Sequence, residues 1–437
     1  MTDTDVTPVP APAGEPGTEG PILEVTNLTK YFPVRSSGLI RRTIGQVQAV
    51  DGVSFEVQRG SSLGLVGESG CGKSTTGRLI TRLYDPTAGS MKFDGREIAS
   101  LSNKQMLPLR SEIQMIFQDP YSSLNPRHTV GTIVGTPLRV HKVVPEKQVL
   151  TRVRELLEVV GLNPEHYNRY PNEFSGGQRQ RIGIARALAL QPKLLVADEP
   201  VSALDVSIQA QVVNLLQDVQ REFGIAFLFI AHDLAVVRHF CPEIAVMYLG
   251  KIVEIGDRET LYNHPHHPYT QALLSAAPDV KQAAIGGRRE RIRLEGDVPS
   301  PINPPSGCRF RTRCWMAQDI CAKVEPPLLQ IGKSHKVACH FAAEYGQAPS
   351  SPITLSALGV DRDGNAVPGA AVSTEDLQRP GYADTWTDLS SHAAASARIH
   401  EDNPTGTVNR PSTGTGGSYT APPSDDDAKD GDQPDRS

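Results

Sequence analysis

The chain has 437 residues, enough for two or three domains at about 150 residues each. Hydrophobic residues make up 38% of it and aromatic residues 5%, so it can bury a core, but we expect part of the chain to lie outside one. The formal net charge of -5, from 44 basic and 49 acidic residues, gives no sign of the basic surface that nucleic-acid binding requires. No apolar run approaches the roughly 18 residues of a membrane-spanning helix, and the composition of residues 1–20 does not predict a secretion signal. We therefore expect a cytosolic protein, whose six cysteines are thiols or metal ligands and not disulfides.

The order of the predicted elements indicates an α/β protein. Residues 1–20 are rich in Pro, Thr and Gly and predict a disordered leader, whereas Ile22 to Val25 predicts the first strand. We expect the polar segment Arg35 to Gln46 to be a loop insertion between two strands. From Val50 to about Gly256, short apolar strands alternate with helical patterns, which is typical of a parallel sheet covered on both faces.

Two further segments complete this organisation. Gln148 to Val160 predicts an amphipathic helix. The apolar residues on its predicted buried side are Leu150, Val153, Leu156, Leu157 and Val160. After about Gln347 the composition shifts to Ser, Thr, Gly, Pro and Asp, so we expect a disordered tail over residues 347–437. The chain shows no internal repeat, which indicates one copy of the folded unit.

A phosphate-binding loop is the first chemical signal in the chain. Residues 67–74 match the G-x-x-x-x-G-K-S (Walker A) pattern in full, between a predicted strand and a predicted helix. Lys73 would neutralise the β- and γ-phosphates of ATP, and the Ser74 hydroxyl would ligate Mg²⁺. We expect Cys71 to act as a small loop residue and not as a nucleophile. The residues predicted to hold the phosphates are Gly67, Glu68, Ser69, Gly70, Cys71, Gly72, Lys73, Ser74 and Thr75.

An apolar strand that ends in two acids provides the second signal. Leu194 to Ala197 predicts a buried strand, and Asp198 and Glu199 follow it directly. The strand would deliver Asp198 to the Mg²⁺ ion and Glu199 to the water that attacks the γ-phosphate. Many strands end in an acid, so this pattern becomes specific only together with the phosphate loop.

The segment Phe174 to Gln178 resembles the signature motif of ABC ATPases, with Phe174 at a position where Leu is commoner. The resemblance implies that Ser175, Gly177 and Gln178 present a helix N-terminus to the γ-phosphate held by an opposite subunit. It therefore implies a head-to-tail dimer of two ATP-binding subunits. Capping of the following helix alone is the simpler alternative for this motif taken by itself.

Further residues match the same family in chain order. Gln118 resembles the Q-loop glutamine that senses Mg²⁺ and the membrane subunit, and Ser202 to Asp205 resembles the D-loop. His232, which follows a predicted strand, is similar to the switch histidine at the γ-phosphate. The resemblance thus implies Glu199, His232 and Gln118 as catalytic residues. Tyr31 matches the aromatic position that stacks on adenine; a buried core tyrosine is the alternative, and both stay open.

Three segments resemble one branch of the family, the oligopeptide and dipeptide importers. They are Phe117 to Pro126, the insertion around Arg35 to Val50, and His267 to Thr270. The resemblance covers roughly residues 22–342 and is nearest to the second of the two ATPase subunits of those importers. It implies an ATP hydrolase at the cytoplasmic face of the membrane, with membrane permease subunits, a second ATP-binding subunit and an extracytoplasmic substrate-binding protein as partners. Nickel or another solute in place of peptides, or a soluble ABC ATPase outside transport, are the alternatives.

The resemblance also implies a domain plan. We expect an ABC nucleotide-binding domain over residues 21–290, with a RecA-like core sheet and a helical subdomain at about 119–190. A Cys-rich extension over residues 291–346 would follow.

Four cysteines lie in this extension. Cys308, Cys314, Cys321 and Cys339 are separated by five, six and seventeen residues, whereas structural zinc sites commonly contain pairs two to four residues apart. The family resemblance implies a [4Fe–4S] cluster, with Arg309, Arg311 and Arg313 offsetting its charge. A structural Zn²⁺ ion and four free thiols are the alternatives. We expect the crowded His264, His266 and His267 to mark a helix entry and not a metal site.

Overall fold

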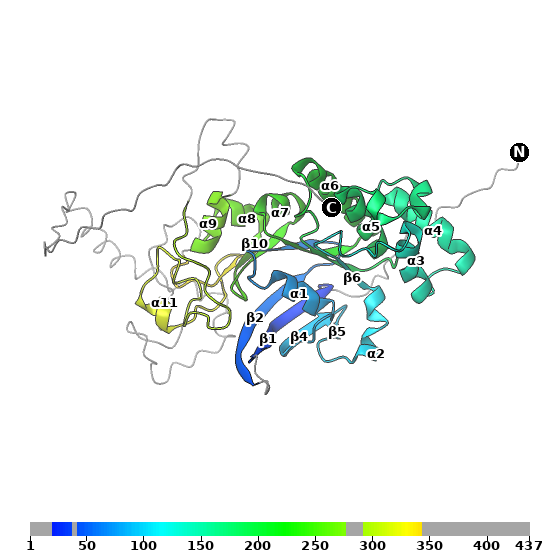
Figure 1. Ribbon diagram of the computed structural model, residues 1–437. Coiled ribbons are helices and arrows are strands. Elements are labelled where there is room, and N and C mark those ends of the chain that lie inside the picture. The colour runs from blue at the N-terminus through cyan, green and yellow to red at the C-terminus, as the bar shows by residue number, and fades with distance from the viewer. Residues whose placement is uncertain (1–19, 37–41, 277–291, 343–437) are drawn as a thin grey trace, which may run out of the picture. The chain divides into compact units, whose positions relative to one another are not determined.

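The computed structural model describes residues 20–36, 42–276 and 292–342. The predicted leader, apart from Gly20, and the predicted tail lie outside the described residues. Two sheets organise the described part of the chain: one has eight strands and the other, antiparallel, has four (Figure 1). In this part of the chain, no helix is both long and apolar enough to cross a membrane.

A parallel core forms the centre of the eight-stranded sheet. In spatial order its strands are β6 (Ile113–Ile116), β7 (Leu194–Asp198), β8 (Ala226–Ala231), β3 (Ser62–Val66) and β9 (Glu243–Tyr248). Each neighbouring pair runs parallel, which confirms the predicted α/β core. Three antiparallel strands extend the sheet beyond β9, namely β10 (Lys251–Asp257), β12 (Lys336–Val337) and β11 (Leu329–Gln330).

Alternate residues of the parallel strands enter two different cores. Leu195, Phe227 and Phe229 belong to the core beneath the helices, whereas Leu194 and Leu228 belong to the core beneath the four-stranded sheet. Successive side chains of a strand point to opposite faces, so a strand buried on both faces is apolar throughout. This is why the continuous apolar runs predicted the sheet correctly.

The four-stranded antiparallel sheet corrects one sequence prediction. Its order is β2 (Thr43–Val57), β1 (Leu23–Arg35), β4 (Ala88–Phe93) and β5 (Arg96–Glu97). The segment expected to be a loop over Arg35 to Gln46 is in part a hairpin, in which Val34 pairs with Gly45 and Arg35 with Thr43. Its strand ends are largely exposed, so backbone hydrogen bonds hold them without apolar side chains. Polar composition therefore misled the prediction.

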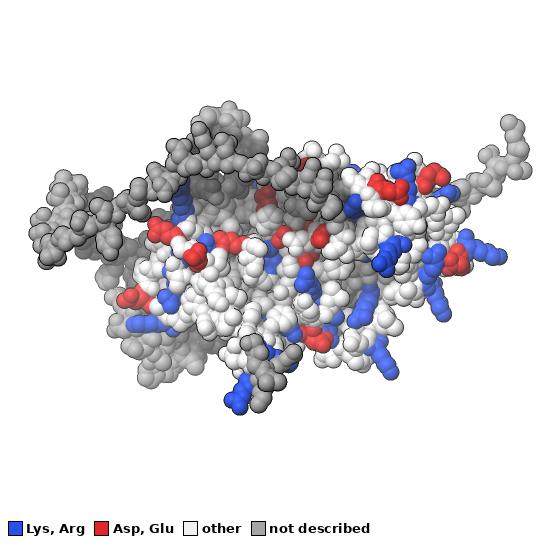
Figure 2. All heavy atoms as spheres, viewed as in Figure 1, with Lys and Arg blue, Asp and Glu red and all other residues white. Residues whose placement is uncertain are grey.

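Helices α3 (Val130–Val140), α4 (Glu146–Val159) and α5 (Gly176–Leu188) pack on one another near the β6 edge (Figure 1). Helix α4 confirms the predicted amphipathic segment, but Leu150 is 43% exposed and Val149 takes the buried position. Figure 2 shows charged side chains of both signs over this end of the molecule. The other α-helices of the described residues are α1 (Lys73–Ile80), α2 (Asn103–Met106), α6 (Val206–Phe223), α7 (Leu234–Phe240), α8 (Arg258–Asn263), α9 (Pro268–Ala276) and α11 (Asp319–Lys323).

The Cys-rich segment docks on the core formed by the two sheets through a buried carboxylate. Glu254 of β10 is fully buried and accepts hydrogen bonds from the backbone N–H groups of His266 (2.8 Å) and His267 (3.1 Å). Nε2 of His335, which precedes β12, lies 2.7 Å from the same carboxylate. Because a buried charge needs such partners, Glu254 fixes both the entry to α9 and the position of the segment.

Candidate nucleotide-binding site

The phosphate-loop sequence leaves β3 and enters α1 through backbone that only glycine adopts readily. Gly67 has a φ of +155° and Gly72 a φ of +108°. A Cβ atom on Gly67 would lie 2.1 Å from the carbonyl oxygen of Met247, and one on Gly72 would lie 2.1 Å from that of Ala49. The loop therefore passes close against two neighbouring backbones, and both glycines are required for its path. Ser69 and Gly70 form the exposed part of the loop.

Lys73 lies inside this loop, 4% exposed. Its ammonium group donates to the carbonyl oxygens of Gly67 (2.7 Å) and Glu68 (2.9 Å), and it lies 4.0 Å from Oε1 of Glu199. A buried ammonium group needs acceptors of this kind. The loop thus holds a positive charge at the start of α1, where the N–H groups of a helix also favour an anion.

Ser74 and Asp198 meet at the same place. The Ser74 hydroxyl donates to Oδ1 of Asp198 at 2.8 Å. Burial raises the pKa of Asp198, and the neighbouring charge of Glu199 adds to the increase. A hydroxyl and a carboxylate are oxygen ligands of the kind that Mg²⁺ takes, and Mg²⁺ commonly binds through one or two carboxylates, water and substrate phosphates. These two residues therefore fit a Mg²⁺ ion.

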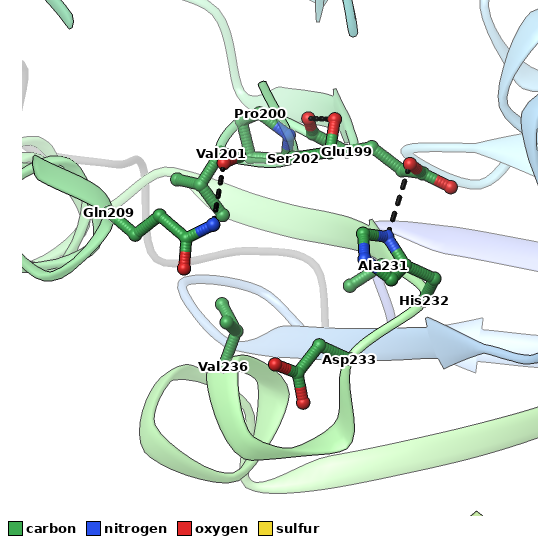
Figure 3. Close-up of a pocket in the computed structure, with 9 residues that line it drawn as sticks. All are labelled: Glu199, Pro200, Val201, Ser202, Gln209, Ala231, His232, Asp233 and Val236. Atoms are coloured by element: carbon green, nitrogen blue, oxygen red, sulfur yellow. Dashed lines mark hydrogen bonds and ion pairs between the residues drawn. The ribbon is translucent and has the colours of Figure 1, made fainter. Parts of the chain in front are cut away.

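Two predicted site residues, Gln118 and His232, contact the carboxylate of Glu199. Its Oε2 accepts from Nε2 of Gln118 at 2.9 Å. The same oxygen lies 3.2 Å from Nδ1 of His232, as Figure 3 shows. The backbone of Glu199 has a φ of +44°, a left-handed conformation that side chains other than glycine rarely adopt. Such backbone costs on the order of 1–3 kcal/mol and is found preferentially at functional sites.

A small pocket adjoins this carboxylate (Figure 3). Gln209 of α6 donates to the carbonyl oxygen of Val201 at 3.0 Å, and Ser202 donates to that of Glu199 at 3.1 Å. These bonds fix the turn that follows β7, at the segment that resembles the D-loop. The pocket is lined by Glu199, Pro200, Val201, Ser202, Gln209, Ala231, His232, Asp233 and Val236.

In the described ranges of the chain, the segment Ser175 to Gln178 and Tyr31 make no hydrogen bond or ion pair with the Glu199 carboxylate, and each has its own neighbours. Ser175 is the exposed N-cap of α5, and its hydroxyl and the Gln178 side chain form a reciprocal capping box. Gly177 is buried, and a Cβ atom there would lie 2.5 Å from Cγ2 of Ile208. Tyr31 is half-buried and donates to Oδ1 of Asp51 at 2.6 Å, so it is not a core tyrosine.

Cys71 is buried in the loop, and burial raises the pKa of its thiol. A protonated, buried thiol is a poor nucleophile, which agrees with the expectation that Cys71 is a small loop residue.

The C-terminal segment, which carries Cys308, Cys314, Cys321 and Cys339, differs from the expectations for its metal site and its arginines. Among the described residues, no group of three or more His, Cys, Asp or Glu side chains could hold a metal ion, so the arrangement supports neither the expected [4Fe–4S] cluster nor the alternative structural zinc. The segment also buries a small apolar cluster, in which Ile320, Val337 and Phe341 pack together. Arg309 and Arg313, which were expected to offset the charge of a cluster, each pair with a carboxylate outside the segment, namely Asp51 and Glu68.

The phosphate loop, the carboxylates of Asp198 and Glu199, and the side chains of Gln118 and His232 lie at one edge of the sheet. This arrangement defines a nucleotide-binding protein of the phosphate-loop class. A family model described as "ABC transporter" matches residues 50–202. A second, described as "Oligopeptide/dipeptide transporter, C-terminal region", matches residues 253–321.

Curated relatives match most of the chain. The oligopeptide transport ATP-binding protein AppF of Bacillus subtilis is 54% identical over 73% of this chain and 97% of its own length. The putative oligopeptide transport ATP-binding protein YkfD of the same species is 54% identical over 74% of this chain and 95% of its own length. A probable peptide ABC transporter ATP-binding protein of Sinorhizobium fredii, y4tS, is 50% identical over 78% of this chain and 96% of its own length. The chain belongs to the ABC transporter family, in its branch of oligopeptide transport ATP-binding proteins.

Asp198→Asn should stabilise the nucleotide-free protein. The raised pKa of Asp198 shows that burial disfavours its charged form, and an amide can still accept the Ser74 hydrogen bond. We expect a gain of about 1 kcal/mol at pH 7, seen as a rise of about 2–4 °C in melting temperature in the presence of EDTA. A melting temperature several degrees below that of the parent protein would contradict this account of the buried charge.

Proposed function

We propose that this chain is the ATP-hydrolysing subunit of an ABC importer for oligopeptides or dipeptides. The observation that carries the ATPase proposal is the Glu199 carboxylate, which faces Lys73, Gln118 and His232 at the carboxyl edge of the parallel sheet. The peptide proposal is supported by the names of the relatives and by the match of the C-terminal family model.

The proposed roles follow from charge and position. Lys73 neutralises the β- and γ-phosphates, while the N–H groups of residues 67–75 surround them. Ser74 and Asp198 hold Mg²⁺, joined by Gln118 once nucleotide is bound. Glu199 polarises the attacking water, and His232 contacts the γ-phosphate. The left-handed backbone of Glu199 supports its assignment, because strained conformations concentrate where geometry serves the reaction.

A second ATP-binding subunit would complete the site. Ser175 is exposed at the start of the 13-residue helix α5, and among the described residues it makes no hydrogen bond to the phosphate loop. An exposed helix N-terminus is suited to an anion that a different molecule holds. We therefore place the opposite subunit's γ-phosphate at Ser175, Gly177 and Gln178, in a head-to-tail dimer that is peripheral to membrane permease subunits.

Tyr31 is the proposed adenine-stacking residue. Its hydroxyl donates a hydrogen bond to Asp51, and the residue is half-buried on β1. The orientation of the side chain is therefore fixed while part of it remains accessible. The proposed domain boundaries are 21–290 for the nucleotide-binding domain, 119–190 for its helical subdomain and 291–346 for the Cys-rich extension.

Glu199→Gln should separate binding from hydrolysis. The amide fills the same space but cannot polarise water, so we expect ATP turnover of the purified complex to fall at least about 100-fold while Mg-ATP stays bound. Lys73→Ala should instead abolish turnover through the loss of phosphate neutralisation. Glu155→Gln, at an exposed carboxylate of α4, is the control and should change turnover by less than about twofold. Normal hydrolysis by the Glu199 variant would overturn its assignment.

We further propose that the Cys-rich segment binds a [4Fe–4S] cluster with a structural role. In such a cluster each thiolate ligates a different iron, so the four sulfurs surround the cluster and do not converge on one point. Burial raises the pKa of Cys339 to about 12, with smaller contributions from the other three thiols, which supports their grouping. When bound, the cluster would cross-link the loops of the segment through Cys308, Cys314, Cys321 and Cys339.

Metal analysis after anaerobic purification tests this proposal. We expect about four irons and four sulfides per chain, with a broad brown absorbance. Cys314→Ser should lose both, whereas Cys241→Ser, at a buried cysteine of the ABC core, should keep them. One zinc without iron, or no metal together with four titratable thiols in the segment, would overturn the proposal.

A further inference from the structure

Two arginines of the C-terminal segment reach the nucleotide site from outside the ABC core. Nη1 of Arg313 lies 2.7 Å from Oε2 of Glu68, and Nη2 lies 3.2 Å from Oε1. Each guanidinium arm therefore contacts its own carboxylate oxygen. Such two-point pairs are stronger and more directional than single hydrogen bonds. The Arg313 side chain is only 9% exposed, so water screens this pair less than it screens a surface salt bridge.

Glu68 is itself part of the phosphate loop and is fixed at three points. Its side chain is held by Arg313, and its backbone N–H lies 2.8 Å from the hydroxyl of Tyr269. Its carbonyl oxygen accepts from Lys73 at 2.9 Å. The pairing thus connects the C-terminal segment to a phosphate-loop residue whose carbonyl oxygen accepts a hydrogen bond from Lys73.

The second arginine leads to the proposed adenine-binding residue. Arg309 pairs with Asp51, donates to Oε1 of Gln48 at 2.7 Å and has a side chain only 7% exposed. Asp51 in turn accepts the hydroxyl of Tyr31 at 2.6 Å. Lys251 lies between the same Asp51 (3.1 Å) and Glu325 of the segment (2.6 Å). The segment therefore supplies a cation, Arg309, and an anion, Glu325, to the ion pairs around Asp51, the residue that binds the Tyr31 hydroxyl.

Phe310 lies between the two arginines in sequence, and its side chain packs against three aromatic rings of the core. Its ring lies 5.2 Å from that of Tyr248, 5.4 Å from that of Tyr269 and 5.7 Å from that of His267, between ring centroids. Arg311, by contrast, is directed within the segment, where its Nε donates to the carbonyl oxygen of Ser306 at 3.0 Å. Arg309 and Arg313 therefore contact the core, whereas Arg311 contacts only the segment in the bonds described.

We propose that the C-terminal segment positions the phosphate loop and Tyr31 through Arg313 and Arg309, so that it sets the affinity of this subunit for ATP. The inference rests on the proposed function of the site. Arg313 and Arg309 are positioning residues, because each acts through a carboxylate of the core and not directly on the nucleotide. Arg313 also neutralises the Glu68 carboxylate, which would otherwise repel the anionic phosphates. Loss of Arg313 leaves that carboxylate unpaired, and an unpaired charge costs more than the pair contributes.

Equilibrium binding of Mg-ATP to the full-length chain tests the phosphate-loop part. Arg313→Ala should raise the Kd about tenfold, equivalent to about 1.4 kcal/mol, and raise KM more than it lowers kcat. In Arg313→Ala combined with Glu68→Gln the uncompensated charge is removed, so at least half of the lost affinity, on a logarithmic scale, should return. Arg311→Ala is the matched control and should stay within about twofold of the parent chain.

Melting temperatures and competition with tripolyphosphate complete the design. Arg313→Ala should weaken tripolyphosphate and ATP alike, whereas Arg309→Lys should weaken ATP alone, because only ATP carries the adenine that Tyr31 would stack on. An unchanged Kd in a folded Arg313→Ala, or no recovery in a folded double variant, overturns the inference. Failure of the parent chain to bind Mg-ATP would refute the proposed function instead. If Arg313→Ala is unfolded, Arg313→Lys is used, and normal affinity there would overturn the two-point pairing.

Discussion

The ammonium group of Lys73 is buried, and a buried charge persists only where acceptors surround it. In this chain the acceptors are two carbonyl oxygens of the loop that carries Lys73 and, more distantly, the carboxylate of Glu199. The loop is in turn pressed against the backbone at Ala49 and Met247, which leaves room for glycine only. The burial of the Lys73 charge therefore depends on the path of the loop, and that path depends on the neighbouring backbone. The nucleotide phosphates, which carry several negative charges, are natural partners for this lysine.

The same constraint explains why the C-terminal segment matters to the site. Carboxylates near a phosphate-binding loop oppose the binding of phosphate unless cations balance them. Glu68 and Asp51 are such carboxylates, and the cations that face them include Arg313 and Arg309. Because Glu254 and the ring of Phe310 fix the segment to β10 and α9, these cations are held in place. The segment therefore forms part of the environment of the nucleotide site, although its sequence lies far from the loop.

Local sequence patterns predicted what depends on neighbours in the chain. The phosphate loop, the acidic end of β7 and the parallel strands were predictable because each is defined within a few residues. The pairing of Arg313 with Glu68 joins residues 245 positions apart, and that of Arg309 with Asp51 joins residues 258 positions apart. No local pattern encodes such contacts, and the spacing of Arg309, Arg311 and Arg313 did not indicate which carboxylates they meet. The β1–β2 hairpin was missed for a related reason, since its polar ends rely on backbone bonds to a partner strand. Leu150 was assigned to the wrong face because apolar spacing on α4 could not distinguish it from Val149.

Hydrogen exchange of the full-length chain, measured by mass spectrometry with and without Mg-ATP, tests most directly the claim that residues 67–75 enclose the phosphates. Backbone N–H groups that bind phosphate oxygens exchange more slowly. We expect the largest protection in peptides that contain residues 67–75, together with smaller protection around Tyr31 and Arg313. Unchanged exchange over residues 67–75, at Mg-ATP concentrations that saturate binding, would contradict the account.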